Sequence, residues 1–256
     1  MRIKMVLEHL GENQAVFPLH YNHDVQSFVY RHISPELAGF LHREGYLVGK
    51  RKFKLFCFSR LLGKYHINSQ EEKISFSGPI SFYLSSPSEK FIQQFAETLL
   101  RTPQVKLSRN LFIISSIEVF PKPLIQGDVA IRMLSPVTVY SILFFANGKK
   151  KTYYYSPFEA EFSQLIRANI LKKYQALYGT SYDEKSSPPH FEISPQRVNQ
   201  NSEKKIKYIP SSGSYTLIKA WLGTYRIRGD PKLISLAYDT GLGSKNSQGF
   251  GMFEIS

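Results

Sequence analysis

A glycine-rich segment, GLGSKNSQGFG, has the composition of a loop that binds phosphate. Four glycines lie within its eleven positions: Gly241, Gly243, Gly249 and Gly251. Glycine permits positive φ angles and lets the backbone come close to a ligand. Exposed backbone N–H groups in such a loop can hold a phosphate, and Lys245 and Asn246 add side-chain donors. The segment therefore predicts a site for an anionic ligand.

The common nucleotide-binding and metal motifs do not describe this segment or the rest of the sequence. The pattern GxxxxGK[ST] is missing, and the segment is predicted to follow a helix, whereas a Rossmann loop follows a strand. A helix end and a tight turn would explain Gly241 and Gly243, but not Gly249 and Gly251. The sequence has no HExxH motif, no paired CxxC and no obvious carboxylate cluster for a two-metal nuclease. Cys57 is the single cysteine, which excludes a disulfide within the chain.

The charge balance favours a polyanionic partner. The net charge is +13, from 33 basic and 20 acidic residues. A positive field of this size attracts polyanions, with nucleic acid the first candidate and an anionic membrane surface the second. Sixteen Tyr and nineteen Phe residues are consistent with stacking of single-stranded RNA on aromatic rings, although most rings are expected in the core.

The hydropathy pattern predicts a soluble protein. Apolar residues make up 42% of the chain and charged residues 21%, as in globular proteins. The chain contains no run of 18 apolar residues, so we expect no membrane-spanning helix. The first residues lack the apolar region of a signal peptide. We therefore expect an intracellular, cytoplasmic protein with no membrane partner.

The first half of the chain is predicted to fold as β-α-β-β-α-β, the ferredoxin-like order. Ser34 is the expected N-cap and Pro35 the first residue of a second helical segment after the helix that starts at Asp24. Ser88 is the expected cap of the helix at 89–101. Strands are predicted at 2–9, 53–60, 73–84 and 111–120, with loops at Phe17-Pro18 and 64–72.

The second half is predicted to be a decorated version of the same arrangement. Helices are expected at 157–178, ended by Gly179, and at 231–240. Strands are predicted at 128–133, 137–146, 150–155, 190–198, 204–209, 214–228 and 250–255, with a turn at Asn147-Gly148 and a loop at 180–189. We predict an α+β protein of two tandem ferredoxin-like (RRM-like, βαββαβ) halves, residues 1–122 and 123–256.

The segment GLGSKNSQGFGMFE resembles the glycine-rich signature of the CRISPR-associated repeat-RNA endoribonucleases, the Cas-six family of the RAMP superfamily. The segments FPLHYNHDVQSFVYRHI, ELAGFLH, KFKLFCFS and MLSPVTV are similar to other parts of that family, so the resemblance spans nearly the whole chain. It implies that the partner is CRISPR repeat RNA and that cleavage needs neither a metal ion nor another cofactor.

The resemblance also implies a reaction and its residues. The ribose 2′-OH attacks the adjacent phosphate, leaving a 2′,3′-cyclic phosphate and a 5′-OH, which calls for a base, an acid and a cation. Several members use a Tyr, a His and a Lys, which match Tyr30, His42 and Lys54. Alternatives for the histidine are His20, His23 and His32, and Lys50 and Lys52 are alternatives for the lysine.

RNA binding is expected at two groups of residues. The glycine-rich loop contributes Gly241, Gly243, Lys245, Asn246, Gly249 and Gly251. The second group is a set of basic residues in the second half: Lys149, Lys150, Lys151, Arg197, Lys204, Lys205, Lys207, Arg226 and Arg228. Phosphate contacts from such side chains make affinity fall with salt.

Two other functions fit the same sequence. One is a non-catalytic RAMP subunit that holds guide RNA in an effector complex, since fold does not fix function. The other is a basic ferredoxin-like module that binds a different polyanion. The sequence leaves open the repeat that is recognised, whether the RNA is a hairpin or unstructured, and whether the protein forms a homodimer or joins effector-complex proteins.

Overall fold

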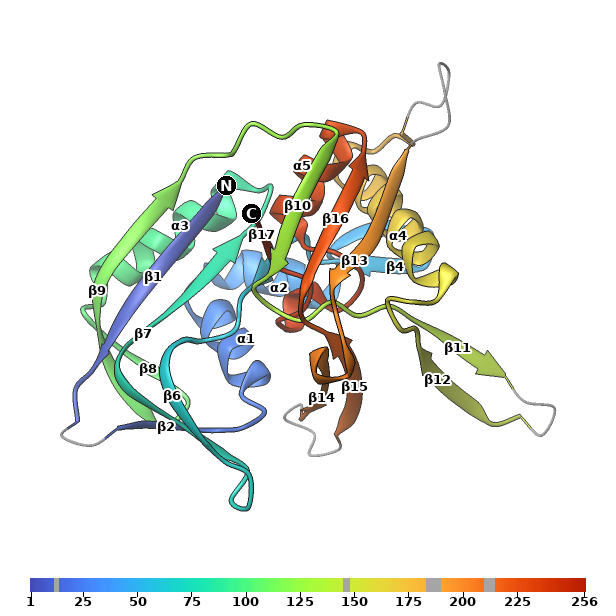
Figure 1. The fold of residues 1–256 in the computed structure, drawn as a ribbon. Coiled ribbons are helices and arrows are strands. Elements are labelled where there is room, and N and C mark those ends of the chain that lie inside the picture. The colour runs from blue at the N-terminus through green and yellow to red at the C-terminus, as the bar shows by residue number, and fades with distance from the viewer. Residues whose placement is uncertain (12–13, 145–147, 183–189, 210–214) are drawn as a thin grey trace.

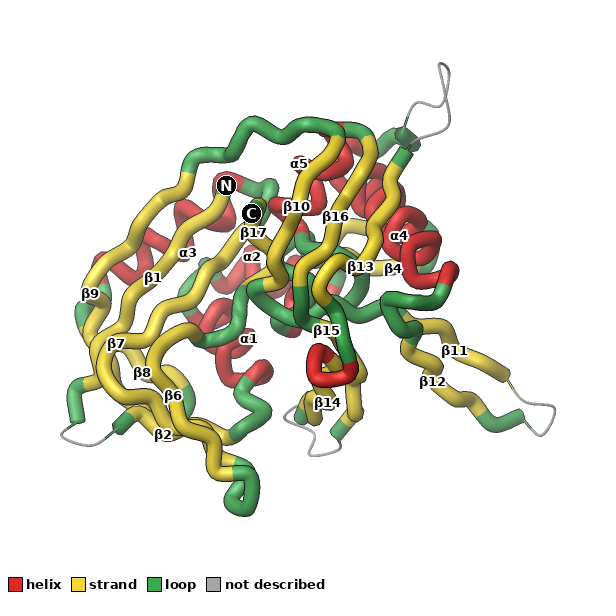
Figure 2. Tube along the Cα trace, viewed as in Figure 1, coloured by secondary structure: helices red, strands yellow, loops and turns green. Residues whose placement is uncertain are grey.

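Two antiparallel sheets, each backed by helices, lie side by side in the computed structural model (Figure 1). The structure describes residues 1–256 except 12–13, 145–147, 183–189 and 210–214. Figure 2 shows the strands of both sheets on the near face and most of the helices behind them. The chain is thus an α+β protein, as predicted from the sequence.

The first sheet belongs to the N-terminal half. Its strand order is β2-β7-β1-β9-β8, and β5 and β6 also pair with β7. The elements of this half are β1 (Arg2–His9), β2 (Ala15–Pro18), α1 (Asn22–Arg31), α2 (Pro35–Arg43), β3 (Tyr46–Val48), β4 (Arg51–Phe53), β5 (Cys57–Phe58), β6 (Leu62–Asn68), β7 (Lys73–Ser85), α3 (Glu89–Arg101), β8 (Gln104–Leu107) and β9 (Asn110–Phe120). The strands β3 and β4 form a separate short hairpin.

The second sheet belongs to the C-terminal half and has the order β13-β16-β10-β17. Its elements are β10 (Asp128–Met133), β11 (Tyr140–Phe144), β12 (Lys150–Tyr154), α4 (Ala160–Tyr178), β13 (Phe191–Arg197), η1 (Gln200–Ser202), β14 (Glu203–Tyr208), β15 (Thr216–Trp221), β16 (Thr224–Gly229), α5 (Pro231–Thr240), η2 (Asn246–Gln248) and β17 (Phe253–Ile255). The hairpins β11–β12 and β14–β15 project from the body of the molecule (Figure 1).

Each half has its own hydrophobic core. The first core runs in sequence from Ile3 to Phe112 and includes Phe28, Phe82 and Phe95, which are fully buried. The second runs from Val129 to Phe253. Burial of apolar surface on this scale is the main favourable term in folding.

The helix ends predicted from Ser34, Ser88 and Gly179 are confirmed. The hydroxyls of Ser34 and Ser88 accept hydrogen bonds from the amides of Leu37 and Phe91, both over 3.3 Å. Such caps satisfy amides that have no partner within the helix. Gly179 ends α4 with φ 74°, in the left-handed region that favours glycine.

Several predicted strands and loops were wrong. Residues at Phe17-Pro18 and 64–72 were predicted as loops, yet β2 and most of β6 occupy them, because both segments pair with β7. The single strand predicted at 53–60 is broken, since Leu55 adopts φ 52° between β4 and β5.

The strands β3 and β8 were missed, and the last predicted strand is shorter, starting at Phe253. The long strand predicted at 214–228 is divided into β15 and β16 by Gly223, at φ 125°. Residue 214, residues 145–146 of another predicted strand, Asn147 of the predicted turn and most of the loop at 180–189 lie outside the described residues.

Buried and ionic contacts fasten the two halves together. The Arg2 side chain, 3% exposed as a residue, donates hydrogen bonds to the carbonyls of Tyr238 and Phe253 over 2.7 and 2.8 Å. Its guanidinium also lies 3.5 Å from the centre of the Tyr238 ring. An ion pair of 2.6 Å joins Lys122 to the buried carboxylate of Asp239. A charge buried in this way is tolerated because it is paired and hydrogen-bonded.

Candidate active site

The C-terminal end of α2 brings two of the predicted catalytic residues together. The hairpin β3–β4 reverses the chain, so that Lys52 and Lys54 lie at the C-terminal end of α2. Lys54 donates a hydrogen bond from Nζ to the carbonyl of His42 over 3.1 Å, and Lys52 donates one to the carbonyl of Arg43 over 2.5 Å. Cations are favourable here because the last carbonyls of a helix carry partial negative charge.

The side chains at this helix end remain available for chemistry. His42 is exposed and Lys54 is half-buried. Burial, and next the charge of Lys52, lower the pKa of Lys54. An ammonium group has three donors, so two remain on Lys54 for an anionic ligand beyond its bond to His42. The pair offers an imidazole and a cation within one short segment.

Tyr30, the third predicted catalytic residue, lies on α1 beside the same segment. Its ring centre is 5.9 Å from that of Phe56, two residues after Lys54. Burial, and next the neighbouring Tyr208, raise the pKa of Tyr30 to about 12. Its phenol therefore stays protonated at neutral pH and can donate a hydrogen bond. In the described part of the chain, no hydrogen bond joins Tyr30 to His42 or Lys54.

The alternative histidines occupy different surroundings. His32 is packed into the edge of the core, with its ring centre 4.3 Å from that of Phe28 and its Nδ1 2.7 Å from the Phe28 carbonyl. Burial lowers the pKa of His20. His23 contacts the ring of Tyr208, with 5.9 Å between ring centres. His32 thus has a packing role, whereas His20 and His23 lie where α1 meets the C-terminal half.

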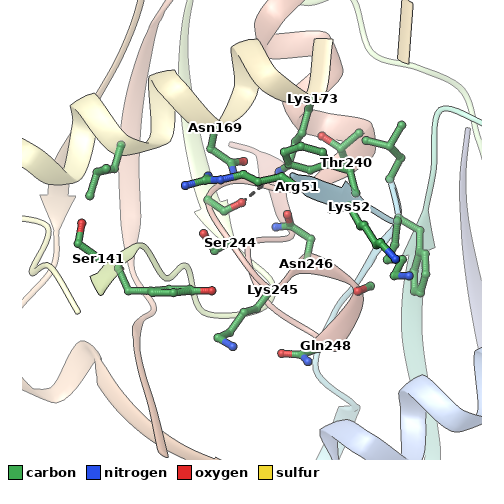
Figure 3. Close-up of a pocket in the computed structure, with 18 of the residues that line it drawn as sticks. Arg51, Lys52, Ser141, Asn169, Lys173, Thr240, Ser244, Lys245, Asn246 and Gln248 are labelled. Atoms are coloured by element: carbon green, nitrogen blue, oxygen red, sulfur yellow. Dashed lines mark hydrogen bonds between the residues drawn. The ribbon is translucent and has the colours of Figure 1, made fainter. Parts of the chain in front are cut away.

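A cavity of about 700 Å³ lies between the two halves. It is bounded by α4, the strand β4 with the residues after it, the start of β11 and the glycine-rich loop (Figure 3). Its basic lining residues are Arg51, Lys52, Lys54, Lys173 and Lys245, and none of its described lining residues is acidic. Phe53, Phe56 and Tyr140 add rings. Such a lining suits an anion that also carries an aromatic group.

The four glycines of the predicted phosphate loop are buried, with φ between 65° and 85°. A Cβ atom on Gly251 would lie 2.0 Å from the carbonyl oxygen of Leu242, and one on Gly243 would lie 2.4 Å from that of Thr138. The amides of Gly241, Gly249 and Gly251 donate to the carbonyls of Ala237, Asn246 and Pro136.

A side chain at any of these four positions would therefore meet protein, although Gly243 also lines the cavity. The reason is steric: only glycine lets the segments 241–243 and 249–251 cross this closely. Contact of the glycines with RNA stays a prediction. The part of the loop that reaches the cavity is 243–248.

Three side chains hold the loop in place. Asn246 donates from Nδ2 to the carbonyls of Leu242 and Phe250 over 2.9 and 3.0 Å. Asn22, the first residue of α1, donates to the carbonyl of Gln248 over 2.7 Å. Lys173 of α4 donates to the carbonyls of Gly241 and Gly243 over 2.7 and 3.1 Å. The loop thus connects the helix that carries Tyr30 to the C-terminal half.

Lys245 projects toward the cavity from this loop. It adopts φ 61°, and its Nζ lies 5.2 Å from the centre of the Tyr140 ring. Burial lowers the pKa of Lys245. The structure thus brings Lys245 and Asn246, both predicted from the sequence, to the same cavity as Lys54.

The other basic residues predicted to bind RNA are spread over different surfaces. Arg226 and Arg228 lie on the exposed face of the second sheet, at 2.7 and 3.3 Å from the carboxylate of Asp128. Lys207 pairs with Glu72 of the N-terminal half. The remaining residues are exposed and lie on or just before β12, at the end of β13 and on β14: Lys149, Lys150, Lys151, Arg197, Lys204 and Lys205.

Sequence reasoning missed the α4 side of the cavity. Asn169 and Lys173 are 8% and 3% exposed, and both line it. They lie four residues apart and so share one face of the helix. Polar and apolar residues are mixed around the neighbouring Lys172 and Lys173, so the sequence does not show which of the two lysines is buried.

A group of three or more metal-ligating side chains is not found among the described residues.

Comparison with known proteins identifies the family. The family model described as CRISPR associated protein Cas6, C-terminal, matches residues 119–255, more than half of the chain. The chain belongs to the Cas6 family. The model of the Cas6 N-terminal region matches residues 16–118, so the two matches adjoin. The glycine-rich segment and the Tyr30, His42 and Lys54 positions fall inside these ranges.

Individual Cas6 proteins resemble the chain over its whole length. A CRISPR-associated endoribonuclease Cas6 of Methanocaldococcus jannaschii is 28% identical over 98% of this chain and 91% of its own. An endoribonuclease-like protein, Cas6nc of Pyrococcus horikoshii, is 24% identical over 100% and 99%. The solved structure of a Cas6-related protein of Pyrococcus furiosus superimposes with a TM-score of 0.81, at 26% identity over 100% and 98%. The fold of this Cas6-family chain is therefore a Cas6 fold. None of its described helices is long and apolar enough to cross a membrane.

Proposed function

We propose that this Cas6-family protein is an endoribonuclease that cuts CRISPR repeat RNA to give guide RNAs. One observation carries the proposal: the chain aligns over 98% of its length with a relative named a CRISPR-associated endoribonuclease. The cavity between the halves supports it, because its basic and aromatic lining suits RNA.

The proposed reaction is an attack of the ribose 2′-OH on the adjacent phosphorus. A bond forms between O2′ and phosphorus while the bond from phosphorus to O5′ breaks, leaving a 2′,3′-cyclic phosphate and a 5′-OH. The 2′-OH proton passes to a base, and an acid protonates O5′. No metal ion takes part in this proposal. The charge that develops on the phosphate oxygens requires a nearby cation.

The positions of three residues suggest their roles. Lys54 supplies the cation, since two of its donors remain free of its bond to His42. His42 is the acid–base group, because it is exposed beside Lys54. Tyr30, whose pKa is raised to about 12, acts as a hydrogen-bond donor to the phosphate or to O5′.

We also propose that the two halves, 1–122 and 123–256, are each ferredoxin-like. The first sheet contains the order β6-β7-β1-β9 and the second has β13-β16-β10-β17. Of these four strands in each half, one precedes a helical segment, two follow it, and a second helix leads to the last one. Two RRM-like sheets joined near Pro121 and Pro123 account for this arrangement.

The test is a cleavage assay with repeat RNA in the presence of EDTA, with the product ends mapped. Products with a 2′,3′-cyclic phosphate and a 5′-OH are expected. His42→Ala should lower the cleavage rate by roughly 10²–10⁴-fold and Lys54→Met by about 10²–10³-fold, with RNA binding retained. Lys90→Met, at an exposed position on α3, is the charge-matched control and should change neither.

Each outcome bears on a different part of the proposal. Loss of cleavage in EDTA would overturn the metal-free reaction. Full activity of His42→Ala would transfer its role to His23 or His20, the histidines near the junction of α1 with the C-terminal half.

A non-catalytic RNA-binding function is the second candidate. It is favoured by the relative from Pyrococcus horikoshii, which is named an endoribonuclease-like protein and matches this chain end to end. Binding of repeat RNA without any cyclic-phosphate product would establish this function and exclude the first.

A further inference from the structure

The wall of the cavity formed by α4 holds an unpaired acceptor. Asn169 is 8% exposed and lines the cavity, and its Oδ1 is buried with no hydrogen-bond partner among the described residues. A buried acceptor without a partner costs free energy, so a turn of the side chain that brings Oδ1 to a donor in the cavity would be favourable. In Figure 3 the Asn169 side chain projects from α4 toward the loop that carries Lys245.

The residues around Asn169 define what kind of ligand fits. Lys173, one turn further along α4, donates to the carbonyls of Gly241 and Gly243, which fixes the position of its amine at the wall. Arg51 and Lys52 are exposed at the rim. With no acidic side chain among the described lining residues, the positive charge of this cavity favours an anion. Water alone would supply a donor to Asn169 but would not balance the charge.

An aromatic ring in the lining places a third requirement on the ligand. Tyr140 lines the cavity, and the Nζ of Lys245 lies 5.2 Å from its ring centre. Rings of this kind stack on the bases of single-stranded RNA. One nucleotide has all three features: a hydrogen-bond donor for Asn169, a negative charge for the rim and a flat ring that can stack on Tyr140. The volume of about 700 Å³ is in the range of small-ligand pockets.

We propose that this cavity takes up one adenine nucleotide of the bound RNA and that Asn169 reads its base. Asparagine recognises adenine by accepting from its exocyclic amine while donating to a ring nitrogen. The nucleotide's phosphate lies at the exposed Arg51, and the base stacks on Tyr140. Asn169 is thus a residue that determines specificity. The inference rests on the proposed function in that the ligand is RNA.

The test measures binding of three fluorescent RNA decamers, A10, C10 and U10, to the full chain in EDTA. The wild-type protein should bind A10 most tightly. Asn169→Ala should weaken A10 binding by roughly tenfold, as expected for loss of a bidentate contact, and leave U10 binding unchanged. The matched control is Gln93→Ala, which removes an exposed amide from α3 and should change none of the three affinities.

A second variant keeps the test decisive if Asn169→Ala does not fold. Arg51→Gln changes an exposed residue at the rim. It should weaken all three decamers alike and reduce the slope of log affinity against log salt by about 0.7, the value for one contact to a single-strand phosphate. Equal binding of A10, C10 and U10 by the wild type, or an unchanged salt slope in Arg51→Gln, would overturn the inference.

The failure of this inference and that of the proposed function can be told apart. If the protein prefers A10 and Asn169→Ala abolishes the preference while repeat RNA stays uncut, the nucleotide site stands and the endoribonuclease proposal falls. If repeat RNA is cut but Asn169→Ala keeps the wild-type base preference, the reverse holds.

Discussion

The ammonium group of Lys54 is bonded to the backbone carbonyl of His42 over 3.1 Å, and not to its imidazole. Because the acceptor belongs to the backbone, His42→Ala removes the imidazole and leaves the anchor of Lys54 in place. The two side chains can therefore be tested independently, although they lie at the same helix end. Lys52 is anchored in the same way to Arg43, so the end of α2 gathers two cations.

The charge of Lys52 should influence the pH at which the cleavage rate falls on the alkaline side. Burial and then Lys52 lower the pKa of Lys54. Lys52→Gln removes the like charge, so the pKa of Lys54 should rise and the alkaline limb of the rate profile should move to higher pH. Single-turnover cleavage rates measured against pH give the shift. Lys90→Met should leave the limb in place, and an unmoved limb in Lys52→Gln would show that Lys54 does not act as a cation in the reaction.

Burial of Lys173 should make the protein more stable as the pH rises. Burial lowers the pKa of this lysine from 10.5 to about 7 in the folded state. Between these values the unfolded chain holds a proton that the folded protein does not, so the free energy of unfolding gains up to about 1.4 kcal/mol per pH unit. Below pH 7 both states are protonated and the gain is absent.

Urea unfolding from pH 7 to 9.5, compared with Lys173→Met, isolates this contribution, because the variant lacks the titrating group. Lys172→Met, at the neighbouring position on α4, should keep the wild-type pH dependence. Parallel pH dependences for the wild type and Lys173→Met would contradict the prediction.

Substitution of Gly251 should test the packing of the glycine-rich loop. Gly251→Ala combines φ 80° with a Cβ only 2.0 Å from the Leu242 carbonyl oxygen. We expect a loss of about 2–5 kcal/mol in the free energy of unfolding, from backbone strain and overpacking together. Gly78 has almost the same φ, 81°, but a Cβ added there would have no atom within 4 Å. Gly78→Ala should therefore lose only about 1–2 kcal/mol. Equal losses in denaturant unfolding would refute the steric explanation.

Substitution of Asp128 should test whether the exposed face of the second sheet binds RNA. Asp128 occupies the guanidinium groups of Arg226 and Arg228. Asp128→Asn frees both arginines, so RNA affinity should rise and its salt dependence should steepen by about 0.7 for each phosphate gained. A salt titration of repeat-RNA binding measures both effects. Glu97→Gln, at an exposed position on α3 and away from this sheet face, is the charge-matched control. An unchanged slope would show that the RNA does not contact these two arginines.

Local signals in the sequence predicted the helices well. Ser34, Pro35 and Gly179 act within a few residues of their own positions, and the structure places each at the predicted helix end. The strands β2 and β6 were missed because their pairing with β7 depends on contacts far away in the sequence.

Some residues of the candidate site could likewise be predicted from the sequence, and others could not. Lys54 and Lys245 could be named from the sequence, and both line the cavity. Asn169 and Lys173 could not be named, because their burial depends on how α4 packs against the glycine-rich loop. The glycines were assigned to a ligand because glycine permits close approach, but the sequence does not say what approaches. At Gly243 and Gly251 the protein's own backbone approaches.

The hydrogen bonds of Arg2 bear on the order in which the two halves fold during synthesis. Its acceptors lie 236 and 251 residues further along the chain, at Tyr238 and Phe253. A ribosome adds about 5–20 residues per second, so β1 can pair within its own sheet on the order of ten seconds before those acceptors emerge. We expect the N-terminal sheet to form while Arg2 is still hydrated, and the two halves to dock only near the end of synthesis. The cavity between them would then be the last feature of the molecule to take shape.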